Sequence, residues 1–158
     1  MELLESSEYQ PLASSIFEQV AEELSRLLPF ARVEHVGASS VPGAISKGDL
    51  DICVVVAATS HSSAVEALQT AGYAIKVDTL RTADLCMLVS PRQDLDVALQ
   101  VVAEGSQFES FVRFRDALRA DRLLVEQYNR IKRNFAAAGA ERYRDEKAKF
   151  IETILRLA

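Results

Sequence analysis

Residues 33–56 read VEHVGASSVPGAISKGDLDICVVV, and this stretch predicts a strand, a turn and a second strand. It alternates polar and apolar residues, turns at Gly-Ala-Ser-Ser, and ends in a β-branched run that is typical of a buried strand. Asp49 and Asp51 stand at the start of that second strand, although aspartate is depleted from strands. Because residues i and i+2 of a strand point to the same face, we expect the two carboxylates to project together. Their position indicates a chemical role.

The acidic pair predicts a metal site. Two carboxylates this close repel each other unless a cation lies between them. Mg²⁺, with Mn²⁺ as a substitute, prefers such hard oxygen ligands. The sequence Leu95-Asp96-Val97 places a third acid between apolar neighbours of a later strand. We predict Asp49, Asp51 and Asp96 as the catalytic and metal-binding residues, with helix caps and surface acids as the alternative explanation.

The residues before the acidic pair predict a phosphate-binding turn. Gly37 can adopt a positive φ and lets the backbone approach a phosphate closely. Ser39 and Ser40 add hydroxyl groups, and the free N–H groups of such a turn can bind anionic oxygens. Lys47 lies two residues before Asp49, where it either contacts phosphate or balances the acidic pair.

The remaining elements alternate helices and strands. Apolar residues at helical spacing run from Pro11, which suits a first helical turn, to Pro29. The chain looks helical from Gly105 to its end, with breaks near 120–121 and at Gly139. Between these regions we predict a helix at 60–71 and strands at 32–36, 50–57, 73–77, 85–89 and 95–102. The result is a single α/β (α+β) domain over residues 1–158, with a mixed β-sheet, flanking helices and a helical C-terminal tail.

Composition narrows the class of protein. Hydrophobic residues make up 49% of the chain, and the net charge of −5 does not favour binding to nucleic acid or an anionic membrane. The segment Phe111 to Lys149 nevertheless carries 11 Lys and Arg against 6 Asp and Glu, so we expect an anionic ligand there or a set of solvated helix faces. The longest apolar run, ICVVVAA, is far below the ~18 residues of a membrane span. Cys53 and Cys86 predict buried reduced thiols, and we expect a cytoplasmic protein.

Other residues have more than one interpretation. For His35 we expect a structural hydrogen bond beside the turn, and for His61, near a helix start, a surface position. Tyr128 with Lys132, and Tyr143 with Lys147, are four residues apart and share helix faces. For Tyr128 and Lys132 we favour core packing with an outward-reaching lysine, and for Lys147 contact with phosphate. Core positions at helical spacing are Phe108, Phe111, Phe114 and Leu118.

The motifs together resemble a known family. The order apolar-Gly, Asp-apolar-Asp, then a later apolar-Asp-apolar is similar to that of the nucleotidyltransferase superfamily, with Ala38 in place of its small polar residue. More closely, Glu34 to Gly43 (EHVGASSVPG) resembles the signature of the GrpB family (UPF0157), which has relatives fused to bacterial dephospho-CoA kinases. The tail also looks like that of GrpB, at Arg115-Asp116, Leu118-Arg119, Tyr128, Lys132, Tyr143, Lys147, Phe150 and Ile151.

The resemblance implies a nucleotidyltransferase-like sheet that carries Mg²⁺ on Asp49, Asp51 and Asp96. The triphosphate of an NTP, ATP by preference, would lie over Gly37, Ser39 and Ser40, with Lys147 as charge partner and an unknown acceptor. The rival hypothesis is a non-catalytic module of the same fold that binds a nucleotide, a CoA precursor or a partner protein. The sequence leaves open whether the N-terminal helix belongs to the core or to a homodimer contact.

Two other classes of enzyme are excluded. The turn lacks the Gly-Lys-Ser/Thr end of a P-loop, so the chain is not a Walker-type ATPase. No Gly-x-Ser-x-Gly sequence is present, so the serines are not predicted as hydrolase nucleophiles.

Overall fold

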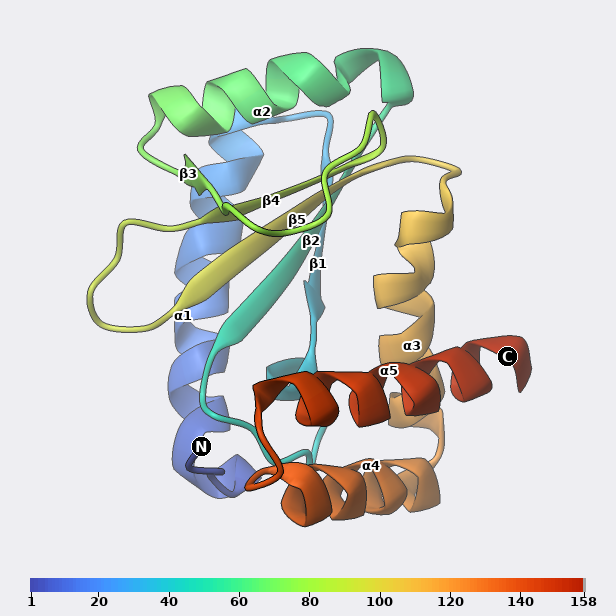
Figure 1. Cartoon of the computed structure of the whole chain (residues 1–158). Helices are drawn as coiled ribbons and strands as arrows, with labels where there is room; N and C mark the ends of the chain where they lie inside the picture. The colour runs from blue at the N-terminus through green and yellow to red at the C-terminus, as the bar shows by residue number, and fades with distance from the viewer. Residues whose placement is uncertain (158) are drawn as a thin grey trace.

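The computed structural model describes residues 1–157 as one β-sheet with helices on both faces and a helical tail (Figure 1). Ala158 lies outside the described residues. The elements are α1 (Ser6–Leu27), β1 (Arg32–Val36), η1 (Ala38–Ser40), β2 (Leu50–Val56), η2 (Ala58–Ser60), α2 (His61–Thr70), β3 (Ala74–Ile75), β4 (Leu85–Val89), β5 (Val97–Ala103), η3 (Gln107–Glu109), α3 (Ser110–Ala120), α4 (Arg122–Phe135) and α5 (Ala140–Leu157).

The sheet is mixed, with the strand order β1-β2-β5-β4-β3. The two central strands, β2 and β5, run parallel, with Asp51 opposite Ala98 and Cys53 opposite Gln100. All other neighbouring strands are antiparallel. A strand buried on both faces reads as a continuous apolar run, which explains the sequences of β2 and β5.

Alternate residues of β2 pack on opposite faces of the sheet. Leu50, Ile52 and Val54 belong to a core that includes residues of α1 and α2. Cys53 and Val55 pack with Val112 of α3 on the other face. Because side chains of a strand alternate, Asp51 points to the face that α3 covers.

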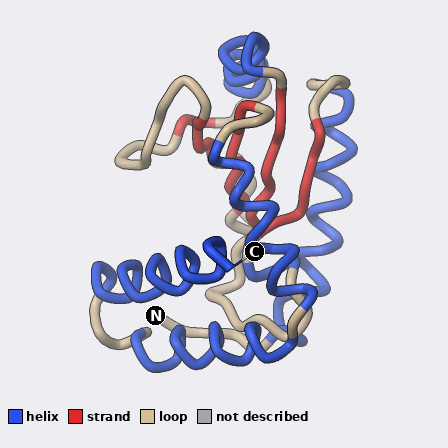
Figure 2. The backbone as a smooth tube through the Cα atoms, turned by 90° about the vertical axis from the view of Figure 1, so that its right-hand side faces the viewer, coloured by secondary structure: helices blue, strands red, loops and turns tan. Residues whose placement is uncertain are grey.

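The helical tail lies across the end of the sheet at which β2 and β5 begin (Figures 1 and 2). Helices α4 and α5 pack on each other, and both contact α3. Asp121 separates α3 from α4, since its side chain accepts a hydrogen bond from Leu123 N and caps α4. The break predicted near 120–121 is therefore confirmed, as is the break at Gly139, which precedes α5.

The structure confirms the fold class and corrects several boundaries. Helix α1 begins five residues before Pro11, because Glu5 N donates to Glu8 Oε1 and starts the helix there. The predicted strand at 73–77 is only the two-residue β3. Strand β5 begins at Val97, which leaves Asp96 just before it.

His61 is buried, not at the surface as predicted. Its Nε2 lies 2.9 Å from the carbonyl oxygen of Val101 in β5, so the first residue of α2 reaches into the sheet. Cys53 and Cys86 are free and buried, as predicted. None of the helices within residues 1–157 has the length and apolar character needed to cross a membrane.

Candidate active site

The acidic pair lies where the tail meets the sheet. Asp51, in β2, accepts a hydrogen bond at Oδ1 from Gln100 Nε2 of β5 at 3.3 Å. Asp49 lies one residue before β2, and its Oδ1 accepts from Ser46 Oγ at 3.2 Å. Burial, followed by the charge of Asp49, raises the pKa of Asp51 to about 6. The two carboxylates therefore interact, as their spacing predicts, and repel each other when both are ionised.

Two lysines of the tail lie in the field of this pair. Burial lowers the pKa of the ammonium groups of Lys147 in α5 and Lys132 in α4, and the charges of Asp49 and Asp51 oppose that lowering. Lys132 is only 3% exposed, so the predicted outward-reaching position is wrong. Its Nζ donates to Ile45 O at 2.7 Å and lies 4.3 Å from the centre of the Tyr128 ring.

The Gly37 turn packs directly on Asp51. Gly37 has φ 72° and ψ −177°, a conformation open essentially to glycine only, and a Cβ there would lie 2.5 Å from Asp51 Oδ2. The first hydrogen bond of the turn joins Ser40 N to Gly37 O at 3.1 Å, so the N–H groups of Ala38 and Ser39 precede it. These two N–H groups are the donors that the turn can offer to an anion.

Both predicted serine hydroxyls are already engaged within the turn. Ser40 Oγ donates to Gly37 O at 2.6 Å. Ser39 Oγ lies 2.8 Å from His35 Nε2, and the His35 ring stacks on Phe17, with the ring centres 4.6 Å apart. Burial, then Arg119 and Arg115, lowers the pKa of His35 to about 4, so the ring is neutral at pH 7. The predicted structural hydrogen bond of His35 is therefore confirmed, and it fixes the position of Ser39.

Side chains from three helices hold the backbone between the turn and the acidic pair. Gln10 Nε2 of α1 donates to Ala38 O at 3.2 Å and to Val41 O at 2.8 Å. Four further side chains each donate to one backbone carbonyl oxygen of this segment: Tyr9 Oη to Ala44 O (2.8 Å), Arg119 Nε to Ser40 O (2.8 Å), Asn129 Nδ2 to Gly43 O (2.9 Å) and Lys132 Nζ to Ile45 O (2.7 Å). Since so many carbonyls are held, we expect the loop to be preorganised.

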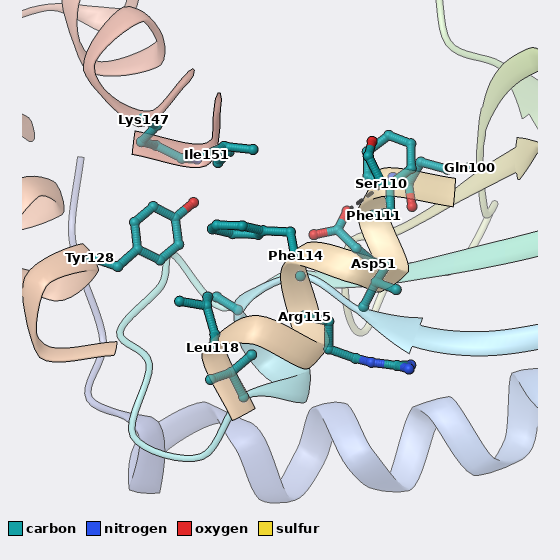
Figure 3. A pocket seen from close by; sticks show the side chains of 14 residues that line it. Asp51, Gln100, Ser110, Phe111, Phe114, Arg115, Leu118, Tyr128, Lys147 and Ile151 are labelled. Carbon is teal, nitrogen blue, oxygen red and sulfur yellow. Dashed lines mark hydrogen bonds between the residues drawn. The ribbon is translucent and has the colours of Figure 1, made fainter. Parts of the chain in front are cut away.

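A cavity of about 270 Å³ opens beside Asp51, between the sheet and the tail (Figure 3). Its polar lining comes from Asp51, Gln100, Ser110, Arg115 and Lys147. Its apolar lining comes from Val36, Val41, Phe111, Phe114, Leu118, Tyr128 and Ile151, with the backbone of Gly37 and Ala38. Residues predicted as core, Phe111, Phe114 and Leu118, thus also form the walls of this cavity.

The third predicted acid lies at a different opening. Asp96 is exposed and shares a groove with Lys47 and Asp49, whereas Asp51 lines the cavity. Lys47 Nζ is 4.0 Å from Asp49 Oδ2, as expected of a residue that balances the pair. Within the described chain, no three Asp, Glu, His or Cys side chains come together in a set that could hold a metal ion. The three-acid site therefore stays a prediction.

Comparison with known proteins identifies the family. The family model described as GrpB protein matches residues 4–157. A UPF0157 protein of Vibrio cholerae is 46% identical over 155 residues, which cover 98% of this chain and 82% of that protein. One of Halalkalibacterium halodurans is 30% identical over 158 residues, covering 96% of this chain and 80% of that protein.

Solved structures agree with this assignment. The conserved protein GrpB from Enterococcus faecalis has a TM-score of 0.75 at 21% identity, with 98% of both chains covered. The RNA terminal uridylyl transferase Cid1 has a TM-score of 0.55 at 14% identity, over 78% of this chain and 39% of that chain, which is a likeness of fold. The chain therefore belongs to the GrpB family (UPF0157) and has a fold similar to that of a nucleotidyltransferase.

Proposed function

We propose that this protein is a Mg²⁺-dependent nucleotidyltransferase that moves a nucleoside monophosphate from an NTP to an acceptor. One observation carries the proposal: the Asp51 carboxylate is packed against a glycine turn and held next to a second carboxylate, Asp49. A protein that needed only stability at this position would place neither charge there, because each makes the other harder to ionise.

The donor set fits a hard divalent cation. Asp49 and Asp51 supply carboxylate oxygens, and Mg²⁺ is commonly held by one or two carboxylates together with substrate phosphates and water. When bound, the ion supplies charge neutralisation for the phosphate chain and polarises its oxygens. Asp96, at the Asp49 end of the site, is the candidate for a third ligand or for the base that takes the acceptor proton.

The other residues bind and orient the triphosphate. The N–H groups of Ala38 and Ser39 face the anion at the turn, and the hydroxyl of Ser39 joins them if His35 donates from Nε2. Lys147 neutralises phosphate oxygens on the side of the helical tail, and Lys47 lies on the side of the groove.

In the transfer itself, the acceptor oxygen forms a bond to the α-phosphorus. The bond from that phosphorus to the oxygen that bridges it to the β-phosphorus breaks, and pyrophosphate leaves with the electron pair. The acceptor proton passes to the base or to water. The chain's contribution is positioning and charge stabilisation, which account for most of the rate in phosphoryl transfer.

A second candidate function, a nucleotide-binding module without catalysis, is favoured by one specific contact. The side chain of β5 that donates a hydrogen bond to Asp51 is the neutral amide of Gln100, while Asp96 opens onto the Asp49 side. Such an arrangement can bind a nucleotide with two carboxylates and leave out the third acid.

Binding of Mn²⁺, followed by electron paramagnetic resonance, tests the metal site directly. We expect the free Mn²⁺ signal to decrease when wild type is added, and to decrease with ATP present by more than ATP alone lowers it, because carboxylate and phosphate oxygens together complete the shell. Asp49→Asn/Asp51→Asn should abolish both effects, and the exposed-acid control Asp145→Asn should not. Equal Mn²⁺ binding by wild type and the double variant would refute the proposal. If Mn²⁺ binding depends on the two aspartates, incubation with [α-³²P]ATP distinguishes the two candidate functions. Label transferred to an acceptor would indicate the enzyme, and binding without transfer would indicate the binding module.

A further inference from the structure

A second hollow adjoins the cavity beside Asp51, at the corner where α3 passes into α4 (Figure 1). This α3–α4 groove has a volume of about 450 Å³. Its charged lining residues are Arg119, Arg122 and Glu126. The two hollows share only Val41 and Leu118, so they are neighbours with separate polar groups. None of the residues proposed to hold the metal or the triphosphate lines this groove.

Arg119 holds the turn with one of its three guanidinium nitrogens. Its Nε donates to Ser40 O at 2.8 Å. Within the described chain its two terminal nitrogens have no hydrogen-bond or ion-pair partner, whereas those of the neighbouring Arg115 reach Glu34 and Asp116. A guanidinium whose Nε is taken can still bind a carboxylate or phosphate through the fork of its two terminal amino groups. Arg119 is therefore a fixed donor with spare capacity.

The groove carries an excess of one positive charge. Arg122 Nε lies 3.8 Å from Glu126 Oε1, and the two side chains are 93% and 56% exposed. So exposed a pair contributes little to stability, and it leaves the charge of Arg119 uncompensated. Burial, followed by the charge of Arg115, lowers the pKa of the Arg119 guanidinium, which remains protonated at pH 7. An anion in the groove would offset this repulsion.

The rest of the groove is largely apolar. Val41, Leu118 and Val125 form its base and belong to one hydrophobic cluster. Pro42 is exposed and forms part of the wall, in a tight turn closed by a hydrogen bond from Ala44 N to Val41 O at 3.1 Å. The two arginines add their aliphatic stems to this surface. A bare ion would leave the apolar surface in water, whereas an anion with an apolar body would cover it.

We infer that the α3–α4 groove binds a small organic anion, a carboxylate or phosphate monoester with a short apolar body, whose charged oxygens accept hydrogen bonds from the terminal amino groups of Arg119. The inference does not depend on the proposed function, since no residue of the metal or triphosphate site takes part. Inorganic phosphate matches the groove less well because it has no apolar part. ATP also matches less well, because its charge far exceeds the single excess positive charge of the groove.

Titrations followed by NMR test the inference in the absence of NTP and metal. The protein is labelled at its Leu and Val methyl groups, and the probes are hexanoate, hexyl phosphate, acetate and hexan-1-ol. We expect hexanoate and hexyl phosphate to shift the signals of Val125, which lines the groove and not the cavity beside Asp51. The ratio of their affinities identifies the preferred head group.

The other two probes separate the apolar and the charged contributions. Hexanoate should bind about tenfold more tightly than acetate, because roughly two more methylene groups are buried. It should also bind about tenfold more tightly than hexan-1-ol, which lacks the charge that strengthens hydrogen bonds to Arg119.

Variants locate the binding. Arg119→Gln should weaken hexanoate binding about tenfold, whereas Arg130→Gln, at an exposed arginine of α4 outside the groove, should not change it. Glu126→Gln removes the carboxylate from the groove and should strengthen binding about threefold. A damaged fold does not produce such a gain, so Glu126→Gln keeps the test decisive if Arg119→Gln fails to fold.

Several outcomes would overturn the inference. Equal affinity for hexanoate and hexan-1-ol would mean that the groove recognises no charge, and equal affinity for hexanoate and acetate would mean that it recognises no apolar body. Equal weakening by Arg119→Gln and Arg130→Gln would indicate only a general attraction to the positively charged tail. Val125 shifts that appear with ATP and not with hexanoate would make the groove part of the nucleotide site.

Discussion

Gly37 lies so close to Asp51 that a methyl group on its Cα would come within 2.5 Å of the carboxylate oxygen Oδ2. The turn and the acidic pair, 14 residues apart in the chain, are therefore parts of one packed unit. A movement of the turn would therefore also shift the carboxylate, so under the proposed function phosphate binding at the turn would affect the geometry of the proposed metal site.

Substitution of Gly37 tests this packing. Gly37→Ala should lower the free energy of unfolding by about 3 kcal/mol or more, because it adds a clash to a backbone strain of ~1–3 kcal/mol. Gly105→Ala is the matched control, since Gly105 has φ 80° and an added Cβ there meets nothing within 4 Å. Urea unfolding measures both variants. Equal losses would show that backbone strain alone matters at position 37.

Neutralising Asp51 should stabilise the metal-free protein. Its folded pKa is raised to about 6 from 3.8, so the folded state binds a proton more tightly than the unfolded state, and stability falls as the pH rises from ~4 to ~6. At pH 7 Asp51→Asn should raise the free energy of unfolding by about 3 kcal/mol, since the rise from 3.8 to about 6 is worth ~1.4 kcal/mol per pKa unit. Asp145→Asn should change it by less than ~0.5 kcal/mol. A destabilised Asp51→Asn would contradict the account.

His35 should give the opposite pH dependence. Its folded pKa is lowered to about 4, below the unfolded value of 6.5, so the stabilisation that it provides is complete above pH 6.5 and is lost as the pH falls toward 4. Because the ring is partly exposed, we expect a loss of only about 1 kcal/mol between pH 7 and pH 5 relative to His35→Gln. NMR titration of the His35 ring protons gives the pKa itself. A midpoint near 6.5 would show that the ring is not held as described.

The loop between the turn and the acidic pair should depend on α4. Asn129 accepts from Ile45 N and donates to Gly43 O, both at 2.9 Å. Asn129→Leu leaves two backbone groups unpaired and should cost about 2–4 kcal/mol of stability. Gln127→Leu, on the exposed side of the same helix, should be nearly neutral. Chemical denaturation of the two variants measures the change in the free energy of unfolding. An unchanged value for Asn129→Leu would mean that the loop is held by its other contacts.

The local parts of the site were predictable from the sequence. The Gly37 turn and the two aspartates follow one another within a short stretch, where residue periodicity and turn preference determine the backbone. The family resemblance also rests on these residues, and it is confirmed by the match over residues 4–157.

The long-range contacts were not predictable in this way. Gln100 meets Asp51 from 49 residues away, and Asn129 meets Ile45 from 84 residues away. Neither residue stands out locally, because a polar residue in a strand or helix is usually exposed. His61 was misplaced for the same reason: its partner, Val101, is 40 residues along the chain. The sequence predicts a strand that includes Asp96 because the apolar residue Leu95 stands before it, but β5 begins only at Val97.

Nucleotide binding that depends on Mg²⁺ and on the two aspartates is best tested by a thermal shift with ATP, GTP, CTP and UTP, each with and without Mg²⁺. The measurement is made on the wild-type protein and on the double variant Asp49→Asn/Asp51→Asn. A nucleotide at 100 times its Kd stabilises the folded state by ~2.7 kcal/mol, which for a chain of this size raises Tm by about 5–10 °C. We predict a Mg²⁺-dependent rise in wild type that is absent in the double variant. A well-folded wild type with no shift for any nucleotide, or an equal shift in both proteins, would show that Asp49 and Asp51 do not form a Mg²⁺-dependent nucleotide site.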